Sequence, residues 1–495
     1  MIKSNGGIIG PDNVTTGGAF GTASGVFKLG EVTNLIKDSK WPTAGPQGFQ
    51  VANSCRFNSG SSDYLNGSGG AGSTKTKFIF STWIKRSEIT AAAGDDIILA
   101  KWSSAADRGH INFSDTPTGV IQLFEKVSNT VTAHLVTNRL FRDVSAWYHI
   151  VYIGDTTQGT AANRLKLYVN GVQETSFGTA TYPSENYNWE LQTLTQDFGV
   201  GAIAANNAGA SPFGGYLSEV VYLDGVAGDV TDFGEFDSQT GIWVPKVVTG
   251  LTFGTNGFYL PFTNSGALGE DFSGNDNDFT VNNLTSIDQS TDTCTTNFAT
   301  WNALFRRGTI TPTFSDGNLT SDFAGGAQQF ALTSFGVTTG KWYAEVKWIS
   351  AHGNGATATG ILDMAYTGTA DPNNAVTNAF GYFGSGTKNV SGSASSYGAS
   401  YGAGDIIGIA LNCDDNQVTF YKNGASQGVI SIIAGVTYGI FGSEYDGRVA
   451  SLNTGSPSFA ISSGNTDGNG FGNFEYAVPS GYLSINTKNL AAVLA

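Results

Sequence analysis

A stretch of acidic and amide residues, GEDFSGNDNDF (269–279), has the side-chain chemistry of a metal site. Hard oxygen ligands of the kind that Ca²⁺ prefers come from Asp271, Ser273, Asn275, Asp276 and Asp278. The spacing is not that of an EF-hand, because no Glu closes the loop. The stretch therefore predicts either a calcium site or a tight turn in which the same side chains hydrogen-bond the backbone.

Two further stretches carry the mixture of aromatic and polar side chains that suits a sugar. Sugars present C–H faces to aromatic rings and hydroxyls to planar polar groups. The stretch SENYNWE (184–190) offers Tyr187, Asn188 and Trp189. A Gly/Ser-rich stretch (380–402) offers Tyr382, Tyr397 and Tyr401, and Ser/Gly/Tyr loops are adaptable binders. We expect these residues to bind a ligand; packing or a subunit contact is the alternative for each aromatic ring.

Histidine, cysteine and glycine residues form no recognisable catalytic or metal-binding pattern. The four histidines, which are His110, His134, His149 and His352, lack an i, i+4 partner, and no Gly-x-Ser-x-Gly motif occurs. No glycine-rich loop ends in Gly-Lys-Ser/Thr, as phosphate binding would need. Cys55, Cys294 and Cys413 are far apart and odd in number, so we expect buried free thiols in a protein folded in a reducing cytosol.

The composition favours β-structure and argues against several classes of protein. The 495 residues include 67 glycines and 12% aromatic residues, and 13% are charged, against about 25% in a typical soluble domain. These values do not fit a coiled coil, a helical bundle or a disordered chain. The net charge of −15 and the scatter of the 25 basic residues argue against a nucleic-acid partner. No secretory signal opens the sequence and no long apolar run occurs, so no membrane insertion is expected.

Alternating apolar residues predict the strands that must carry these side chains. They occur at 78–86, 147–153, 164–171, 214–225, 340–350 and 404–424, the last range containing two strands around a turn. Asn170-Gly171 and Asn423-Gly424 are hairpin signals, because both residue types tolerate positive φ. Trp83, Trp147, Trp342 and Trp348 should lie in the core, and His149 should be a core or edge residue of its strand.

One short helix is predicted near the start of the chain. Leu29, Val32, Leu35 and Ile36 form an apolar stripe within residues 26–40, before Trp41-Pro42 ends the helix. A helix of this length cannot bury its stripe alone, so it should dock on another surface. We therefore divide the chain into an N-terminal anchor or assembly segment (1–50), a β-sandwich (51–235), a connector (236–310) and a second β-sandwich (311–495).

The order of these segments resembles known families. FNSGSSDYL (57–65), FIFSTWIKR (78–86), WYHIVYIGD (147–155), LKLYVNG (165–171) and GGYLSEVVYLDG (214–225) are similar to segments of laminin-G-like, concanavalin A-like jelly-roll domains. GKWYAEV (340–346) and GDIIGIALNCDDNQVTFYKNG (404–424) resemble the SPRY domain. The resemblance implies an all-β fold with two antiparallel β-sandwich (jelly-roll) domains, which the short helical anchor predicted above would precede. It also implies carbohydrate binding as the natural task of the first sandwich.

The concanavalin A-like fold also hosts glucanases, whose signature is E-x-D-x-x-E. Here the nearest run has Glu235 and Asp237, but Thr240 replaces the third carboxylate. We therefore expect a surface turn rather than a catalytic pair, and no enzyme activity. No cofactor is expected other than the calcium ion named above.

The remaining segments resemble virion proteins of tailed bacteriophages. They are residues 260–285, the tail 479–490 and the opening GGIIGPDN with GVFKLGEVTNLIKDSKWP (25–42). The resemblance implies a virion structural protein on the tail or capsid surface, made in the host cytoplasm. We expect a tail fibre or adhesin, homo-oligomeric and trimeric, that contacts other virion proteins and a host surface glycan or protein. A capsid decoration or head-fibre protein is the alternative, and a polysaccharide-degrading enzyme a third.

Overall fold

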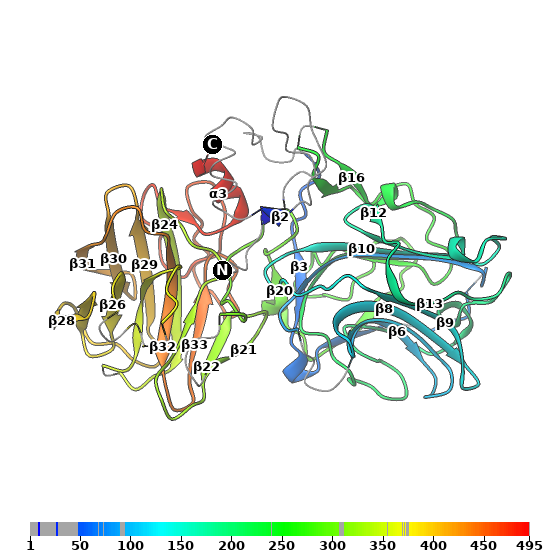
Figure 1. The fold of residues 1–495 in the computed structure, drawn as a ribbon, viewed down its shortest axis with the longest axis horizontal. Coiled ribbons are helices and arrows are strands. Elements are labelled where there is room, and N and C mark those ends of the chain that lie inside the picture. Colours follow the sequence, from blue (N-terminus) through cyan, green and yellow to red (C-terminus); the bar gives the residue numbers. More distant parts are fainter. Residues whose placement is uncertain are drawn as a thin grey trace. The chain divides into compact units, whose positions relative to one another are not determined.

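A computed structural model describes residues 8–9, 26–27, 48–67, 69–72, 74–89, 95–238, 240–305, 311–353, 355–368, 370, 372 and 376–494. The described residues from 48 to Thr295 form one compact unit, and those from Thr296 onward form another. We call them the N-terminal and C-terminal units. Each is built almost entirely of antiparallel strands, as the sequence predicted (Figure 1).

Two sheets make up the sandwich of the N-terminal unit. The β5 sheet has the strand order β12-β11-β10-β5-β15-β3-β20, with β18 also paired to β15. The β8 sheet has the order β13-β9-β8-β7-β6-β14-β4-β19. The strand bounds are β3 Ser54–Phe57, β4 Tyr64–Gly67, β5 Lys77–Arg86, β6 Asp96–Trp102, β7 Arg108–Asp115, β8 Thr118–Val127, β9 Thr130–Thr137, β10 Tyr148–Asp155, β11 Leu165–Val169, β12 Val172–Gln173, β13 Phe177–Thr181, β14 Phe198–Val200, β15 Gly215–Asp224, β18 Phe258–Leu260, β19 Phe279–Asn282 and β20 Gln289–Ser290.

Short elements complete this unit. A separate hairpin pairs β16 (Gly234–Phe236) with β17 (Trp243–Pro245). The helical turns are η1 Ser59–Ser61, η2 Ala161–Asn163, α2 Glu190–Thr193, η3 Val230–Asp232 and η4 Ser286–Asp288. Strands β18, β19 and β20, which fall within the segment predicted as a connector, pair with β15, β4 and β3.

Both faces of β5 are buried, which explains its nearly continuous apolar sequence. Phe78 and Phe80 belong to the cluster between the two sheets, together with residues of β7 and β8. Trp83, on the opposite face, belongs to a second cluster with Trp147 and Trp243. Among the described residues, this second cluster covers much of the outer face of the β5 sheet.

The C-terminal unit is a second sandwich. Its β24 sheet has the order β21-β22-β33-β24-β29-β30-β31, with β34 parallel to β24, and its β32 sheet has the order β23-β32-β25-β26-β27-β28. The bounds are β21 Thr313–Ser315, β22 Thr320–Phe323, β23 Gln329–Leu332, β24 Lys341–Ser350, β25 Ala358–Asp363, β26 Ala379–Phe383, β27 Thr387–Val390, β28 Ser393–Ser396, β29 Ile406–Asn412, β30 Gln417–Lys422, β31 Ala425–Ser431, β32 Tyr438–Glu444, β33 Arg448–Asn453, β34 Leu483–Ser484 and the terminal helix α3 Thr487–Leu494.

The strands and turns predicted from alternation are confirmed. The structure has β5, β10, β11, β15, β24, β29 and β30 at the predicted places. Asn170 and Gly171 have φ of 48° and 77°, and Asn423 and Gly424 have φ of 48° and 79°, so both pairs form hairpin turns. Trp83, Trp147, Trp342 and Trp348 are all buried, as predicted, and His149 is buried as well.

The predicted N-terminal helix falls mostly outside the described residues. Val26 and Phe27 form the short strand β2, which pairs with β1 (Ile8–Ile9), so these two residues are not helical. Leu29, Val32, Leu35 and Ile36 lie outside the described residues, and their role in assembly stays a prediction. In the described part of the chain, no helix is both long enough and apolar enough to span a membrane.

Candidate functional site

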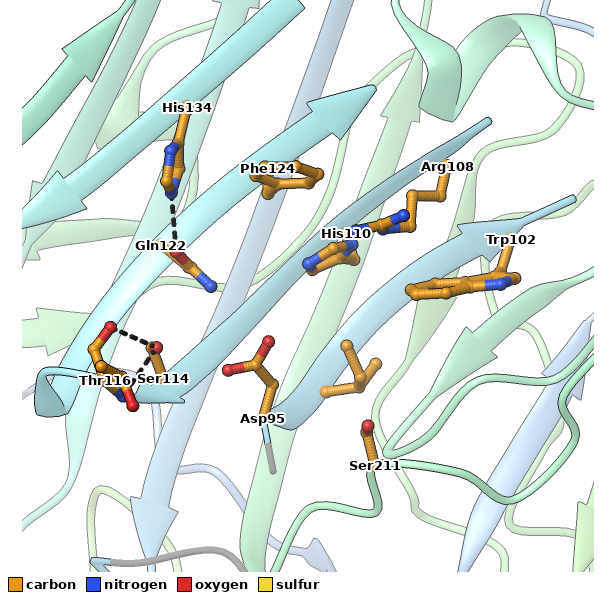
Figure 2. A pocket seen from close by; sticks show the side chains of 11 residues that line it. Asp95, Trp102, Arg108, His110, Ser114, Thr116, Gln122, Phe124, His134 and Ser211 are labelled. Carbon is orange, nitrogen blue, oxygen red and sulfur yellow. Dashed lines mark hydrogen bonds between the residues drawn. The ribbon is translucent and has the colours of Figure 1, made fainter. Parts of the chain in front are cut away.

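The outer face of the β8 sheet carries a hollow of about 230 Å³ (Figure 2). Strands β6, β7, β8 and β9 lie side by side there and supply most of its walls. Alternate residues of β7 and β8 point inward, where Ile111, Phe113, Ile121 and Leu123 are fully buried. The residues between them therefore face outward and line the hollow.

Aromatic rings from four neighbouring strands form a row across this face. They are Trp102, His110, Phe124 and His134, one from each of β6, β7, β8 and β9. The ring centroid of His110 lies 5.7 Å from that of Trp102 and 5.3 Å from that of Phe124. The cross-strand register explains the row, since His110 pairs with Phe124 and Phe124 pairs with His134.

Arg108 brings the one positive charge among the lining residues. Its guanidinium carbon lies 4.6 Å from the ring centroid of Trp102 and 5.0 Å from that of Phe124. Its Nη1 donates to the carbonyl of Ala105, and its buried Nε has no hydrogen-bond partner among the described residues. Burial lowers the pKa of Arg108, and the Asp95 carboxylate, which also lines the hollow, partly offsets that effect.

His110 is buried and leaves a ring nitrogen unused. Its Nδ1 has no hydrogen-bond partner among the described residues. Burial lowers the pKa of His110 to about 3, with further lowering by Arg108 and His134. The ring is therefore neutral at physiological pH, with one nitrogen that donates and one that accepts.

Gln122 adds a further donor next to this ring. The Nε2 of His134 lies 2.9 Å from Gln122 Oε1, so the carbonyl end of the Gln122 amide is turned toward His134. Figure 2 shows the amide nitrogen of Gln122 on the side of the hollow. Ser114, Thr116 and Ser211 line the remaining wall with hydroxyl groups. The hollow thus combines apolar ring surface with donors and acceptors, a combination that suits a hydroxylated ring compound.

The stretch 184–190 lies elsewhere in the same unit, and part of it is buried in the core. Trp189 is fully buried against Phe78, and its Nε1 donates to the carbonyl of Thr76. The Tyr187 hydroxyl lies 2.9 Å from that of Thr132, whereas Asn188 is exposed. Of the three predicted ligand residues here, Asn188 and part of Tyr187 are accessible.

Glu125 holds the end of this stretch in place. Its carboxylate accepts hydrogen bonds from the backbone nitrogens of Glu190 and Leu191, at 3.0 and 3.1 Å. Burial raises the pKa of Glu125 to about 8, although both backbone donors favour the ionised form. We assign Glu125 a structural role.

The three tyrosines of the second predicted loop do come together. The Tyr382 ring lies 4.8 Å from that of Tyr401 and 5.3 Å from that of Tyr397, measured between centroids. Tyr382 and Tyr401 are buried, and the Tyr401 hydroxyl donates to the backbone carbonyl of Tyr382 at 2.6 Å. Tyr397 is half-buried, with the ammonium of Lys388 5.3 Å from its ring centroid. Tyr397 is the one of the three that offers surface to a ligand.

The acidic stretch 269–279 folds into a hydrogen-bonded turn. The Asp271 carboxylate accepts from the backbone nitrogens of Tyr259, Ser273 and Asn277. Asp278 accepts from the nitrogen of Asp271, Asn275 donates to two backbone carbonyls, and Asp276 has a φ of 56°. In the described part of the chain, no three His, Cys, Asp or Glu side chains are grouped to hold a metal ion. Calcium binding by these residues stays a prediction.

Asp237, in the run compared with the glucanase signature, also closes a turn. Its carboxylate accepts from the backbone nitrogen and the hydroxyl of Thr240, both at 2.7 Å. This geometry is that of the surface turn predicted for the run.

Sequence reasoning missed the hollow. Two of the strands that line it carry a pattern that sequence analysis could have used. In β7, Arg108 and His110 alternate with apolar residues of the core, as Gln122 and Phe124 do in β8. The sequence does not show which strands lie side by side, so residues from four strands could not be grouped into one site.

Comparisons with known protein families find a match within each of the two sandwiches. The model of the concanavalin A-like lectin/glucanases superfamily matches residues 59–227, and the model of the SPRY domain matches residues 341–436. No curated protein matches the chain.

Several solved structures are similar to parts of the chain. The SPRY domain of human HERC1 is 22% identical, with a TM-score of 0.25, over 27% of this chain and 87% of that one. The PSpry domain of TRIM65 is 13% identical, with a TM-score of 0.26, over 31% and 89%. A Bacteroides ovatus protein described as a candidate carbohydrate-binding protein is 15% identical, with a TM-score of 0.32, over 48% and 60%. Residues 59–227 of the N-terminal unit are thus similar to domains of the concanavalin A-like lectin/glucanases superfamily, and residues 341–436 of the C-terminal unit are similar to SPRY domains.

Proposed function

We propose that this chain is a virion structural protein of a tailed phage, a tail fibre or adhesin that binds a host surface glycan through the hollow on the β8 sheet. The role is binding rather than catalysis. A homo-oligomer would multiply a weak single-site affinity through high local concentration of the other sites.

The hollow carries the proposal because its walls place the rings of Trp102 and Phe124 beside the side chains of Arg108, His110 and Gln122. The Nε of Arg108 and the Nδ1 of His110 have no hydrogen-bond partner among the described residues. Both atoms are buried, so a ligand in the hollow would pair with the accessible polar atoms of the lining side chains and contact the rings beside them. Sugar hydroxyls can donate to one group and accept from another, which matches a neutral imidazole beside a guanidinium.

The superfamily of the first domain and the resemblance of the other segments support the rest of the proposal. The matching family model is named for lectins and glucanases. The resemblance of residues 6–13, 25–42, 260–285 and 479–490 to phage virion segments supports a place on the particle. A virion protein that binds a host receptor accounts for both the lectin-like domain and the phage-like segments.

Replacing Arg108 tests the glycan site directly. Arg108→Met keeps an unbranched side chain over the rings of Trp102 and Phe124 but removes every guanidinium donor. We expect the affinity for bound glycans, first identified on a glycan array, to fall about 10–100-fold in calorimetry, as for a lost charge-assisted hydrogen bond. Arg142→Met is the matched control, since Arg142 is exposed in the same unit and does not line the hollow. Unchanged binding by Arg108→Met, or no glycan bound by the wild type, would refute the site.

Electron cryomicroscopy of intact particles of the encoding virus tests the place in the virion. Density for the chain at the tail or its fibres is the expected result. Density spread over the capsid would favour the decoration protein, and absence from the particle would overturn the virion assignment.

A further inference from the structure

On one side of the C-terminal unit, both sheets end in exposed strands. Strand β28 is the last strand of the β32 sheet, and β31 is the last strand of the β24 sheet (Figure 1). All four residues of β28 are exposed, and most residues of β31 are exposed as well. Val429 of β31 is 55% exposed and Ile433, just beyond it, is 46% exposed. An end strand has backbone donors and acceptors with no neighbour on one side.

The two end strands are joined to each other, so they form one edge. The Tyr397 hydroxyl, just after β28, donates to the backbone carbonyl of Gly428 in β31. The backbone nitrogen of Ala399 donates to Gln427 Oε1 at 2.8 Å. These contacts hold β31 in place from the side of the β32 sheet.

This edge carries no charged residue over two long stretches. None occurs from Asn389 to Gly404 or from Asn423 to Ser443, in a chain with a net charge of −15. Natural proteins protect exposed edges from pairing with other strands by placing Lys, Pro or inward-pointing charges on them. Neither Lys nor Pro occurs in β28 or β31.

We propose that β31 pairs with β31 of a second copy of this chain, so that the β24 sheets of two copies become continuous. Two acidic chains repel each other least where the contacting strands carry no charge, and β31 has no charged residue. An antiparallel strand is complementary to itself about a two-fold axis, because each copy offers the same alternating donors and acceptors. The inference rests on the homo-oligomer of the proposed function and names its contact.

Other exposed edges in the described residues fit less well. Strand β12 has only two residues. Strand β13 is flanked in the chain by Glu174 and Glu185, whereas no charged residue lies within several residues of β31 on its C-terminal side. Identical edges related by a two-fold axis form a closed dimer, whereas the sequence analysis predicted a trimer. The measured mass of the oligomer therefore distinguishes a dimer from a trimer.

The mass of the full-length chain, measured by analytical ultracentrifugation over a concentration series, tests the pairing. The wild type should form dimers or assemblies of dimers. Val429→Lys should raise the dissociation constant about a hundredfold or more, because it brings positive charges together across the pair. Val172→Lys is the matched control, since Val172 is 49% exposed on the end strand β12 and should leave the mass unchanged.

Amide hydrogen exchange tests directly whether β31 forms the contact between the two copies. Amides of residues 425–431 that face away from β30 should be protected in the wild-type oligomer and should lose protection in Val429→Lys. A monomeric wild type, a trimer with unprotected β31 amides, or an oligomer that survives Val429→Lys would each overturn the pairing. The single-site glycan affinity of Val429→Lys, measured by calorimetry, should equal that of the wild type, so a failed glycan site and a failed pairing give different results.

Discussion

His149 lies beside a serine in an arrangement that could be taken for a nucleophile and its base. Its Nε2 is 2.9 Å from the Ser81 hydroxyl, but its Nδ1 accepts a hydrogen bond from Trp243 Nε1 at 2.9 Å. An Nδ1 that accepts leaves the proton on Nε2, so the ring donates to Ser81 and cannot take the serine proton. Burial also lowers the pKa of His149 to about 3. The group holds Trp243 over the β5 sheet and has no catalytic role.

Glu219 makes the stability of the N-terminal unit depend on pH. It lies at a bulge in β15, is 6% exposed, and accepts a hydrogen bond from the Tyr259 hydroxyl at 2.5 Å. Burial raises its pKa to about 7, whereas in an unfolded chain a Glu ionises near pH ~4.3. Its contribution is therefore fully present below pH ~4.3 and is lost as pH rises through about 7.

We therefore predict that the unfolding free energy of this unit falls from pH 4.5 to pH 8, by up to about 3 kcal/mol from Glu219. Glu219→Gln, which keeps an acceptor for Tyr259, should flatten this part of the profile in denaturant titrations. The unfolding free energy of the variant should still fall somewhat as pH rises, because the pKa of Glu125 is also raised, to about 8. A constant difference between wild type and variant at every pH would contradict the prediction.

The tryptophan residues show where sequence reasoning succeeds and where it stops. Trp83 and Trp348 were assigned to the core from alternation within a single strand, which needs no knowledge of neighbours. Trp189 was assigned to a ligand loop because polar neighbours surround it in sequence, yet its ring is buried against Phe78. The environment of Trp189 depends on segments far away in the chain, and local composition carries no information about them.

At the scale of elements, the hairpin at Asn170-Gly171 was predicted from two residues because positive φ is a local property. The sequence did not show that Trp243, from β17, covers this turn. A Cβ on Gly171 would overlap the Trp243 ring, which the hydrogen bond to His149 holds in place. The turn therefore needs glycine for two reasons, one local and one from tertiary packing.

Substitution by alanine separates these two reasons. Gly250 has a φ of 69°, and no other atom lies within 4 Å of the position that a Cβ would take, so Gly250→Ala should cost about 1 kcal/mol, from backbone strain alone. Gly171→Ala, at a φ of 77°, should cost about 1–3 kcal/mol more, because the Trp243 ring must move. Urea unfolding of both variants measures the difference. Equal costs would show that the ring yields without penalty.

At the scale of the whole molecule, the N-terminal unit is closed by a contact between residues far apart in the chain. The Lys85 ammonium of β5 lies 2.7 Å from the Asp292 carboxylate, and both side chains are almost fully buried. Asp292 Oδ1 also accepts from Trp147 Nε1 at 3.0 Å. The last stretch of the unit is thus fixed to the middle of the β5 sheet, just before the C-terminal unit begins.

Breaking this pair should destabilise one unit and not the other. Removing one partner of a buried ion pair costs about 3–5 kcal/mol, since the remaining charge stays buried, so Asp292→Ala should lower the unfolding midpoint of the N-terminal unit. Asp292→Asn keeps an acceptor for Trp147 but still leaves the Lys85 ammonium without its carboxylate, so most of the loss should persist. Glu185→Ala, which breaks a pair with Arg164 at 3.7 Å where Glu185 is 54% exposed, should cost about 0–1 kcal/mol. Calorimetry should show the midpoint of the C-terminal unit unchanged in all three variants; a shift there would mean that the two units unfold together.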